Sequence, residues 1–230
     1  MKQLKVLYED NHIIVVEKPP NIPSQGDKTN DENMLDIIKG YIKEKYNKPG
    51  NVYVGLVHRL DRPVGGVMVF AKTSKAASRL SEQVRNKIFK KEYLAIVDGK
   101  LENKSGTLED YLLKNEKNNM SKVVPENTKN TKNAKYAKLD YEVLKYDSDI
   151  NLSVLKVLLH TGRHHQIRVQ LANCGHSICG DQKYGTRGRG KQISLWAYSL
   201  TIVHPITKEE MKFEDVPEKI GPWSILKDIM

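Results

Sequence analysis

The chain has 230 residues, enough to bury a hydrophobic core in one large α/β or mostly-β domain or in two small ones. Charge interrupts the apolar residues of its start, MKQLKVLYED, which excludes a signal peptide, and no apolar run approaches the roughly 18 residues of a membrane span. A net charge of +10 favours a polyanionic partner, nucleic acid first, with a charge kept for solubility as the alternative, and two cysteines favour a reducing cytoplasm over a disulfide framework.

The first part of the chain alternates predicted strands and helices. Apolar runs predict a strand pair at 5–8 and 13–16 and a buried strand at 67–71, while three prolines predict a loop within 18–33. Helical spacing predicts one helix with Leu35, Ile38 and Ile42 on a single face. A second helix is predicted to begin at the N-cap Ser74, with a buried stripe of Ala77, Leu80, Val84 and Ile88.

Strands dominate the middle of the chain. A polar loop over residues 114–135 separates two of them and carries six lysines against two glutamates, a composition that predicts no packed core. This loop is either a solvated hairpin tip or an arm that contacts RNA phosphates. The predicted strands are 93–97, 106–113, 136–144 and 152–159.

Turn and helix signals follow the last of these strands. Thr161 is predicted to cap a helix whose apolar stripe includes Ile167, Leu171 and Cys174, with Gly175 as its terminator. Arg168 would then lie at the border of the buried face. A turn at 180–185, a basic loop at 187–191, a strand at 194–203, a turn at 204–207 into another strand and a C-terminal helix complete the prediction.

The run His58-Arg59-Leu60-Asp61 places an acid beside cationic residues, ahead of a Pro63–Gly66 turn and a buried strand. A carboxylate beside a guanidinium stays ionised at neutral pH, so it can act as a nucleophile or a base. A surface salt bridge or a turn-capping role explains Asp61 equally well from residue type alone. No phosphate-binding GxxxxGK[ST] loop, GxGxxG or GxSxG motif is present, which argues against a nucleotide-driven motor, a dinucleotide enzyme and a serine hydrolase.

Four motifs, taken in order, resemble the RluA-like pseudouridine synthases. The opening stretch 10–19 is also similar to that family's first strand pair, and the resemblance runs from about residue 5 to residue 213. One departure is Val64-Gly65-Gly66, where the family usually has Thr-Ser-Gly. The motifs are His58-Arg59-Leu60-Asp61, Lys91-Glu92-Tyr93-Leu94-Ala95, Thr161-Gly162-Arg163-x-His165-Gln166-Ile167-Arg168, and Gly175-His176-x-Ile178-x-Gly180-Asp181 with Tyr184-Gly185.

The resemblance implies an α+β fold with a long, mixed, mostly antiparallel sheet, flanking helices and a central active-site cleft. It also implies isomerisation of uridine to pseudouridine in ribosomal or transfer RNA, without a metal or organic cofactor. Asp61 would be the catalytic aspartate, Tyr93 would stack on the target base, Arg168 would pair with Asp61, and Arg59 would fill the space left by the flipped uridine. His58, Arg163 and Gln166 are the other residues expected to bind the RNA substrate.

The whole chain, 1–230, is predicted to be a single catalytic domain without an N-terminal accessory RNA-binding domain, acting as a cytoplasmic monomer. The alternative is an RNA-binding or ribosome-assembly factor that has the same fold and no catalytic activity. The two hypotheses differ in whether the Asp61 carboxylate is needed for function.

Overall fold

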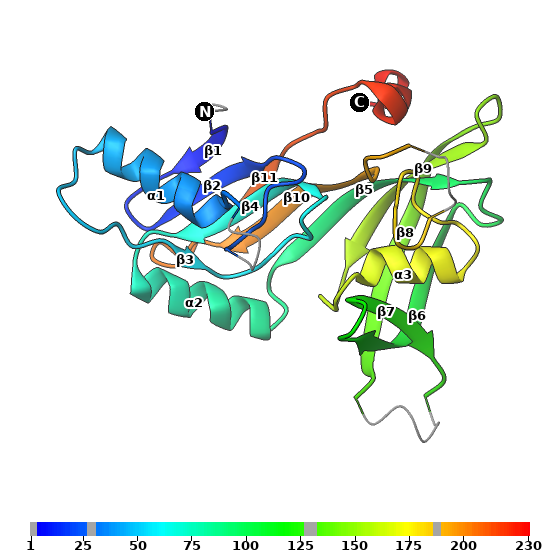
Figure 1. Cartoon of the computed structure of the whole chain (residues 1–230), viewed down its shortest axis with the longest axis horizontal. Helices are drawn as coiled ribbons and strands as arrows, with labels where there is room; N and C mark the ends of the chain where they lie inside the picture. Colours follow the sequence, from blue (N-terminus) through cyan, green and yellow to red (C-terminus); the bar gives the residue numbers. More distant parts are fainter. Residues whose placement is uncertain (1–3, 27–30, 127–132, 186–189) are drawn as a thin grey trace. The chain divides into compact units, whose positions relative to one another are not determined.

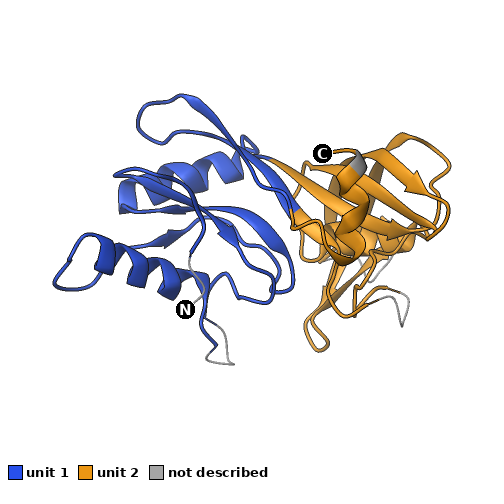
Figure 2. Cartoon of the chain, turned by 90° about the horizontal axis from the view of Figure 1, so that it is seen from above, with its two compact units in different colours: residues 1–90, 197–216 blue, residues 91–196, 217–230 orange. Residues whose placement is uncertain are grey.

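The structure is a computed structural model that describes residues 4–26, 31–126, 133–185 and 190–230. This described chain contains eleven strands, three α-helices and one 3-10 helix (Figure 1). It divides into unit 1, residues 1–90 and 197–216, and unit 2, residues 91–196 and 217–230 (Figure 2). The predicted α+β class, with a mostly antiparallel sheet and flanking helices, is confirmed. The central cleft stays a prediction.

Unit 1 is built on its most apolar segments. All seven residues of β4 are buried, and Ile13 to Val16 of β2 are fully buried, because these runs lie inside the sheet with a strand on either side. The strand order is β1-β2-β4-β10, with β11 beside β10 and β3 beside β4, and β2 pairs antiparallel with both β1 and β4. The strands are β1 Val6–Glu9, β2 Ile13–Lys18, β3 Gly55–Leu56, β4 Gly65–Ala71, β10 Leu195–Val203 and β11 Glu210–Glu214.

Two helices belong to unit 1, and the structure corrects the details predicted for both. In α1, Met34–Lys45, the residue buried with Ile38 and Ile42 is Met34, whereas Leu35 is only partly buried. The cap of α2, Ser74–Arg85, is Thr73 and not Ser74, because the Thr73 hydroxyl accepts the Ala76 N–H over 3.2 Å.

The buried stripe of α2 is rotated around the helix axis relative to the predicted one. Its buried residues are Ala76, Leu80 and Gln83, while Ala77 and Val84 are partly buried. Ile88 lies beyond the helix end and is 42% exposed. Ala76 and Leu80 pack into the core formed by β2 and β4, so the apolar face of α2 covers one side of this sheet.

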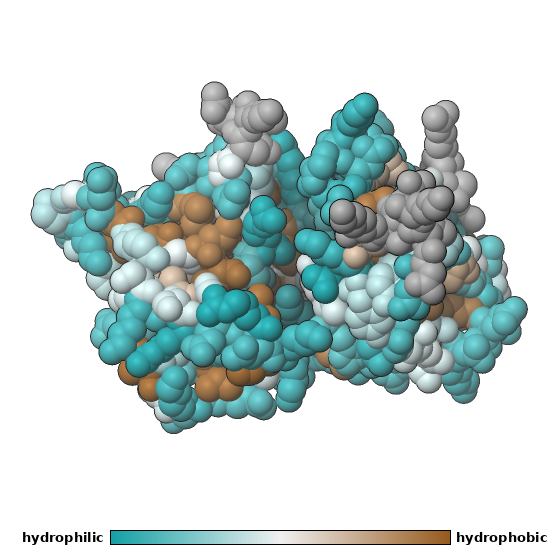
Figure 3. Space-filling view, turned by 90° about the horizontal axis from the view of Figure 1, so that it is seen from below, coloured by the Kyte–Doolittle hydropathy of each residue, from teal (hydrophilic) through white to brown (hydrophobic). Residues whose placement is uncertain are grey.

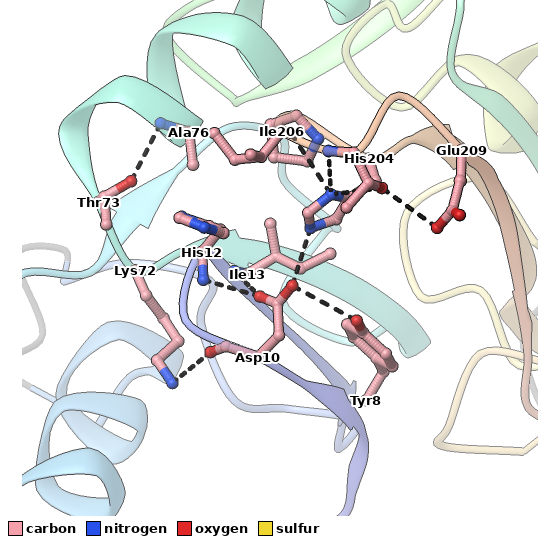
Figure 4. A network of polar contacts seen from close by, with 12 residues as sticks. Tyr8, Asp10, His12, Ile13, Lys72, Thr73, Ala76, His204, Ile206 and Glu209 are labelled. Atoms are coloured by element: carbon pink, nitrogen blue, oxygen red, sulfur yellow. Dashed lines mark hydrogen bonds and ion pairs between the residues drawn. The ribbon is translucent and has the colours of Figure 1, made fainter.

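A polar network ties the turn between β1 and β2 to the turn between β10 and β11 (Figure 4). The Asp10 carboxylate accepts the N–H groups of His12 and Ile13, each over 2.7 Å, and lies 2.8 Å from Nε2 of the buried His204. Lys72 Nζ donates to the Asp10 carbonyl over 2.6 Å. Three separate segments of unit 1 are therefore held at one point.

Unit 2 is an antiparallel sheet with one α-helix and the C-terminal 3-10 helix. Its strand order is β5-β9-β8-β6-β7, and β5 pairs with β9 from Lys91 opposite Leu159 to Asp98 opposite Leu152. The elements are β5 Lys90–Asp98, β6 Ser105–Asn115, β7 Met120–Val124, β8 Lys135–Asp147, β9 Leu152–Leu159, α3 Gln166–Asn173 and η1 Gly221–Asp228.

The prediction that residues 114–135 form only a polar loop was wrong. Residues 120–124 form β7, which pairs with β6 from Met120 opposite Asn115 to Val124 opposite Tyr111. Ser121 and Val124 are buried. The contacts that stabilise this short strand come from β6 and from α3, so the polar composition of the surrounding segment did not reveal it. Residues 127–132 of the lysine-rich segment lie outside the described residues, as do residues 187–189 of the predicted basic loop.

The cap predicted for the third helix was also wrong. α3 begins at Gln166, and its N-cap is His165 in the left-handed region with φ 53°. The Thr161 hydroxyl instead donates to the Gln166 side chain over 2.8 Å, and Cys174 is exposed. Gly175, with φ +88°, ends the helix as predicted.

The surface seen in Figure 3 is mostly hydrophilic, with smaller apolar patches between the polar groups. The exposed large apolar side chains include Tyr46, Tyr53, Ile150 and Ile220. No helix in the described ranges has the length and apolar character needed to cross a bilayer.

Candidate active site

Asp61 lies in a tight turn that leads into β4. The N–H of Val64 donates to the Asp61 carbonyl over 3.0 Å and closes the turn. Gly66 follows with φ +119°, and a Cβ at this position would overlap the backbone of Ala197 on β10. Only glycine fits there, so the entry into β4 is constrained by the neighbouring strand.

Both sequence neighbours of Asp61 are held by buried side chains. The Ser24 hydroxyl donates to the Leu60 carbonyl over 3.0 Å and accepts the Leu60 N–H over 3.2 Å. The ammonium of Lys18 donates to the Arg62 carbonyl over 3.0 Å. The backbone that carries Asp61 is therefore fixed on both sides by interactions inside unit 1.

Lys18 is a fully buried cation at the end of β2. Its ammonium makes two further hydrogen bonds, to the carbonyls of Pro19 over 2.9 Å and Ile22 over 2.7 Å. Burial lowers the pKa of Lys18 to about 7, and the nearby negative charge of Asp61 acts in the opposite direction. Lys18 thus joins β2, the following loop and the Asp61 turn.

The basic residues near Asp61 in sequence have different surroundings. Arg59 is exposed, whereas Nε2 of His58 accepts the Val69 N–H over 3.1 Å and its ring packs edge-on against Phe89. Arg62 forms a surface ion pair with Asp31 at 2.5 Å. The contacts of His58 anchor it to the scaffold, while the exposure of Arg59 suits a residue that meets RNA. RNA binding by either residue stays a prediction.

Tyr93 lies on β5 in unit 2, opposite Val157 of β9. Its side chain is only 7% exposed, and Leu94 to Val97, which follow it, are fully buried. The strand therefore holds Tyr93 firmly. Stacking of its ring on a base stays a prediction.

The loop between β9 and α3 is organised by Gln166. Its side-chain oxygen accepts hydrogen bonds from the Thr161 hydroxyl over 2.8 Å and the Arg163 N–H over 3.1 Å, and its side-chain nitrogen donates to the Lys138 carbonyl over 3.1 Å. Arg163 is exposed and donates from Nε to the Tyr136 carbonyl over 2.8 Å. Gln166 thus stabilises the loop that carries Arg163, and RNA binding by these two residues stays a prediction.

Arg168 is buried, and its prediction as a residue at the border of the helix face was wrong. Its Nε and NH2 groups each donate to an oxygen of Asp181 over 2.7 Å, and the two side chains are 5% and 0% exposed. Burial alone would raise the pKa of Asp181, but Arg168 and the N–H groups of Lys183 and Tyr184 lower it below 3.8. The pair fixes the plane of the guanidinium.

A layer of aromatic rings adjoins this pair. The guanidinium carbon of Arg168 lies 5.3 Å from the centre of the Tyr184 ring. The Tyr184 hydroxyl accepts the Ser121 N–H over 2.6 Å and lies 2.9 Å from Nδ1 of His165, whose ring stacks on His164. This layer connects β7 to the start of α3.

Sequence reasoning did not name Lys18 or Asp181 as site residues. Both lie in stretches that resemble the family, because Gly180-Asp181 belongs to the fourth motif and Lys18 belongs to the opening stretch 10–19. Among the described residues, no group of three or more His, Cys, Asp or Glu side chains is arranged to hold a metal ion.

The predicted site residues fall into two groups. Unit 1 contains Asp61, Arg59 and His58, and unit 2 contains the others. The pairing of Asp61 with Arg168 stays a prediction. The residues in unit 2 are Tyr93, Arg163, Gln166 and Arg168.

Known proteins resemble this chain over most of its length. The uncharacterized RNA pseudouridine synthase YhcT of Bacillus subtilis is 33% identical over 211 residues, which cover 90% of this chain and 66% of the relative. The ribosomal large subunit pseudouridine synthase C of Salmonella typhimurium is 32% identical, covering 91% of this chain and 65% of the relative. The chain thus spans slightly less than two thirds of these two proteins.

A shorter relative matches along nearly its whole length. The tRNA pseudouridine synthase C of Haemophilus influenzae is 30% identical over 230 residues, covering 90% of each chain. The structure of human RNA pseudouridylate synthase domain containing 4 shares the fold, with a TM-score of 0.78 over 93% of this chain and 89% of that chain at 23% identity.

The family described as RNA pseudouridylate synthase matches residues 12–173, which include Asp61, Tyr93 and Arg168. The chain therefore belongs to the RNA pseudouridylate synthase family, whose members are isomerases.

Proposed function

We propose that this chain isomerises specific uridines in ribosomal or transfer RNA to pseudouridine, with Asp61 as the catalytic carboxylate. The observation that carries the proposal is the Asp61 turn, in which the flanking residues Leu60 and Arg62 are held by the buried Ser24 and Lys18. A reacting carboxylate needs such a fixed backbone, because small displacements of a catalytic group slow a reaction strongly.

In this reaction the bond between N1 of uracil and C1′ of the ribose breaks, and a bond between C5 and C1′ forms. The proton on C5 leaves, and N1 gains one, so the nucleotide keeps its composition and needs no external reactant. Asp61 would either attack C1′ or assist formation of a glycal intermediate. The other groups need only to hold the base, orient the carboxylate and exclude water.

Tyr93 would stack on the target uracil and assist removal of the C5 proton. Arg168 would pair with Asp61 and keep it ionised, while its bidentate bonds to Asp181 hold the guanidinium in place. Arg59, which is exposed, would occupy the space left in the RNA when the uridine flips out. Arg163 would contact the RNA directly. His58 and Gln166 would contribute to RNA binding by supporting the loops that contact it.

The charge of the chain supports RNA as the partner. Lys and Arg number 38 against 28 Asp and Glu, and phosphate contacts can offset the few kcal/mol that unstacking a base costs. The relatives named for ribosomal large subunit and tRNA substrates support both classes of RNA as candidates. We further propose that the protein acts as a cytoplasmic monomer without a cofactor.

The test is release of tritium from RNA labelled at C5 of uridine. Wild-type protein should release tritium from RNA of cells that lack the gene, and Asp61→Asn should release none while it still binds RNA. Asp31→Asn is the matched control, because it removes an exposed carboxylate from the same unit and should leave release unchanged. If Asp61→Asn released tritium at the wild-type rate, the catalytic assignment would be wrong. No release by wild-type protein would favour the assembly-factor alternative.

A further inference from the structure

Lys91 is a partly buried lysine at the start of β5, paired through its backbone with Leu159 of β9. Successive side chains of a strand point to opposite faces. Its neighbour Lys90 is exposed and lies 3.7 Å from Glu210. Two adjacent lysines therefore have different environments, one exposed to solvent and one partly covered by protein.

The ammonium of Lys91 has no protein partner within the described part of unit 2. Burial lowers the pKa of Lys91, and among the described residues no carboxylate or hydrogen bond opposes that effect. Lys18 differs, because its buried ammonium donates to three carbonyls. Covering a cation without an anion or an acceptor costs free energy. This arrangement is therefore suited to an anion that arrives from outside the protein.

The ammonium lies close to the loop between β9 and α3. A Cβ built on Gly162 would lie 3.6 Å from Lys91 Nζ, so the ammonium reaches the loop between β9 and α3 where this loop has no side chain. Gly162 and Arg163 are exposed. The ammonium thus lies beside a solvent-accessible segment that carries a second cation.

Tyr93 follows two residues later on the same face of β5. Side chains two positions apart on a strand are separated by roughly 7 Å. The base of a nucleotide lies at a comparable distance from the phosphate of the same nucleotide. A nucleotide whose base lies on Tyr93 can therefore direct a phosphate toward Lys91.

We propose that Lys91 binds a phosphate of the RNA strand next to the target uridine, so that β5 holds the base through Tyr93 and the backbone through Lys91. The proposal rests on the stacking role given to Tyr93 in the proposed function. A compact ammonium suits this contact, because it attracts a phosphate as a point charge without requiring one fixed geometry.

The experiment compares Lys91→Met with Lys90→Met, which removes the same charge from the adjacent, exposed position. Both changes are made in the Asp61→Asn background, so that binding is measured without turnover. The probe is ribosomal and transfer RNA from cells that lack the gene, titrated over a range of salt concentrations. Denaturant unfolding of the same variants reports on their stability.

Lys91→Met should weaken RNA binding and reduce the slope of log K against log salt by about 0.7, the value for one phosphate contact on single-stranded RNA. It should leave the protein as stable as its parent or more stable, because a partly buried cation without an anionic partner is removed. Lys90→Met should leave the slope unchanged. A role confined to the fold would give the opposite result, namely lower stability with an unchanged slope.

An unchanged slope in Lys91→Met, or an equal decrease in Lys90→Met, would overturn the proposal, as would an absence of RNA binding by the parent. The outcome is separable from that of the proposed function. Tritium release with an unchanged slope removes Lys91 alone from the site. A reduced slope in a protein that releases no tritium leaves a phosphate contact on a non-catalytic RNA-binding protein.

Discussion

Lys18 and Arg168 are both buried and hydrogen-bonded near the candidate site, but their partners differ. In unit 1, Lys18 donates to three backbone carbonyls, so it fixes the course of the chain beside Asp61. In unit 2, Arg168 donates twice to one carboxylate, so Asp181 fixes the plane of its guanidinium. One cation is used to position a backbone, while the other is itself positioned. The difference indicates that removing Lys18 displaces the turn, whereas removing Asp181 leaves a charge uncompensated.

The largest expected effect is at the ion pair. Arg168→Met leaves the buried Asp181 carboxylate without its cation, so the free energy of unfolding should fall by about 3–5 kcal/mol. Denaturant unfolding measures this change. Glu109→Gln, which breaks an exposed pair with Lys138 in the same unit, is the control and should cost about 0–1 kcal/mol. Equal effects of the two substitutions would show that burial of the Arg168 pair has no energetic consequence.

A smaller loss of stability is expected at Lys18. Lys18→Met leaves three backbone carbonyls without this donor but also removes a buried charge, so the cost should be about 1–3 kcal/mol. Because the Asp61 turn loses one of its supports, tritium release should decrease more than RNA affinity. Lys39→Met, at an exposed position of α1, should change neither. A Lys18→Met protein with normal turnover would mean that the Asp61 turn holds its position without the ammonium.

The smallest expected effects are changes in the free energy of unfolding with pH. Lys18 in unit 1 should respond near neutral pH, and Asp181 in unit 2 should respond at acidic pH. The pKa of Lys18 is about 7 in the folded chain and near 10.5 in the unfolded one, so the unfolded state binds more protons. Stability should therefore rise, by about 1 kcal/mol between pH 7 and 8, and Lys18→Met should lack this rise. The pKa of Asp181 is lowered in the folded chain from its ordinary value of 3.8. The stability contributed by its ionised carboxylate is therefore present above about 3.8 and is lost as the pH falls below that value.

Unfolding curves of wild type, Lys18→Met and Asp181→Asn, recorded from acidic pH to pH 8, test both the rise near neutral pH and the loss at acidic pH. If Lys18→Met kept the alkaline rise of the wild type, the titrating group would be elsewhere.

Much of the fold could be predicted because its strands carry local signals. The apolar runs at 13–16 and 67–71 lie in β2 and β4, and 152–159 matches β9 residue for residue. The helix caps were less predictable. Thr73 and Ser74 are both good caps, and the choice depends on which hydroxyl reaches the Ala76 N–H. Strand β7 depends on its pairing with β6, which its own residues do not indicate.

The candidate site was predictable only in part, for a related reason. Asp61, Tyr93 and Arg168 occur in motifs that can be matched, whereas the roles of Lys18 and Asp181 depend on burial and on partners distant in sequence. Lys18 bonds to a carbonyl 44 residues away, and Arg168 bonds to a carboxylate 13 residues away. The resemblance of residues 10–19 to the family's first strand pair does not show that the Lys18 side chain is buried or which carbonyls it contacts.

We propose above that the Asp61 carboxylate catalyses formation of pseudouridine in RNA. The most direct measurement maps pseudouridines across ribosomal and transfer RNA from cells that lack the gene and from cells in which it is restored as wild type or as Asp61→Asn. If Asp61 is the catalytic carboxylate, specific pseudouridines should disappear with the gene, return with the wild type and stay absent with Asp61→Asn. Their return with Asp61→Asn, or an identical map with and without the gene, would contradict this proposal.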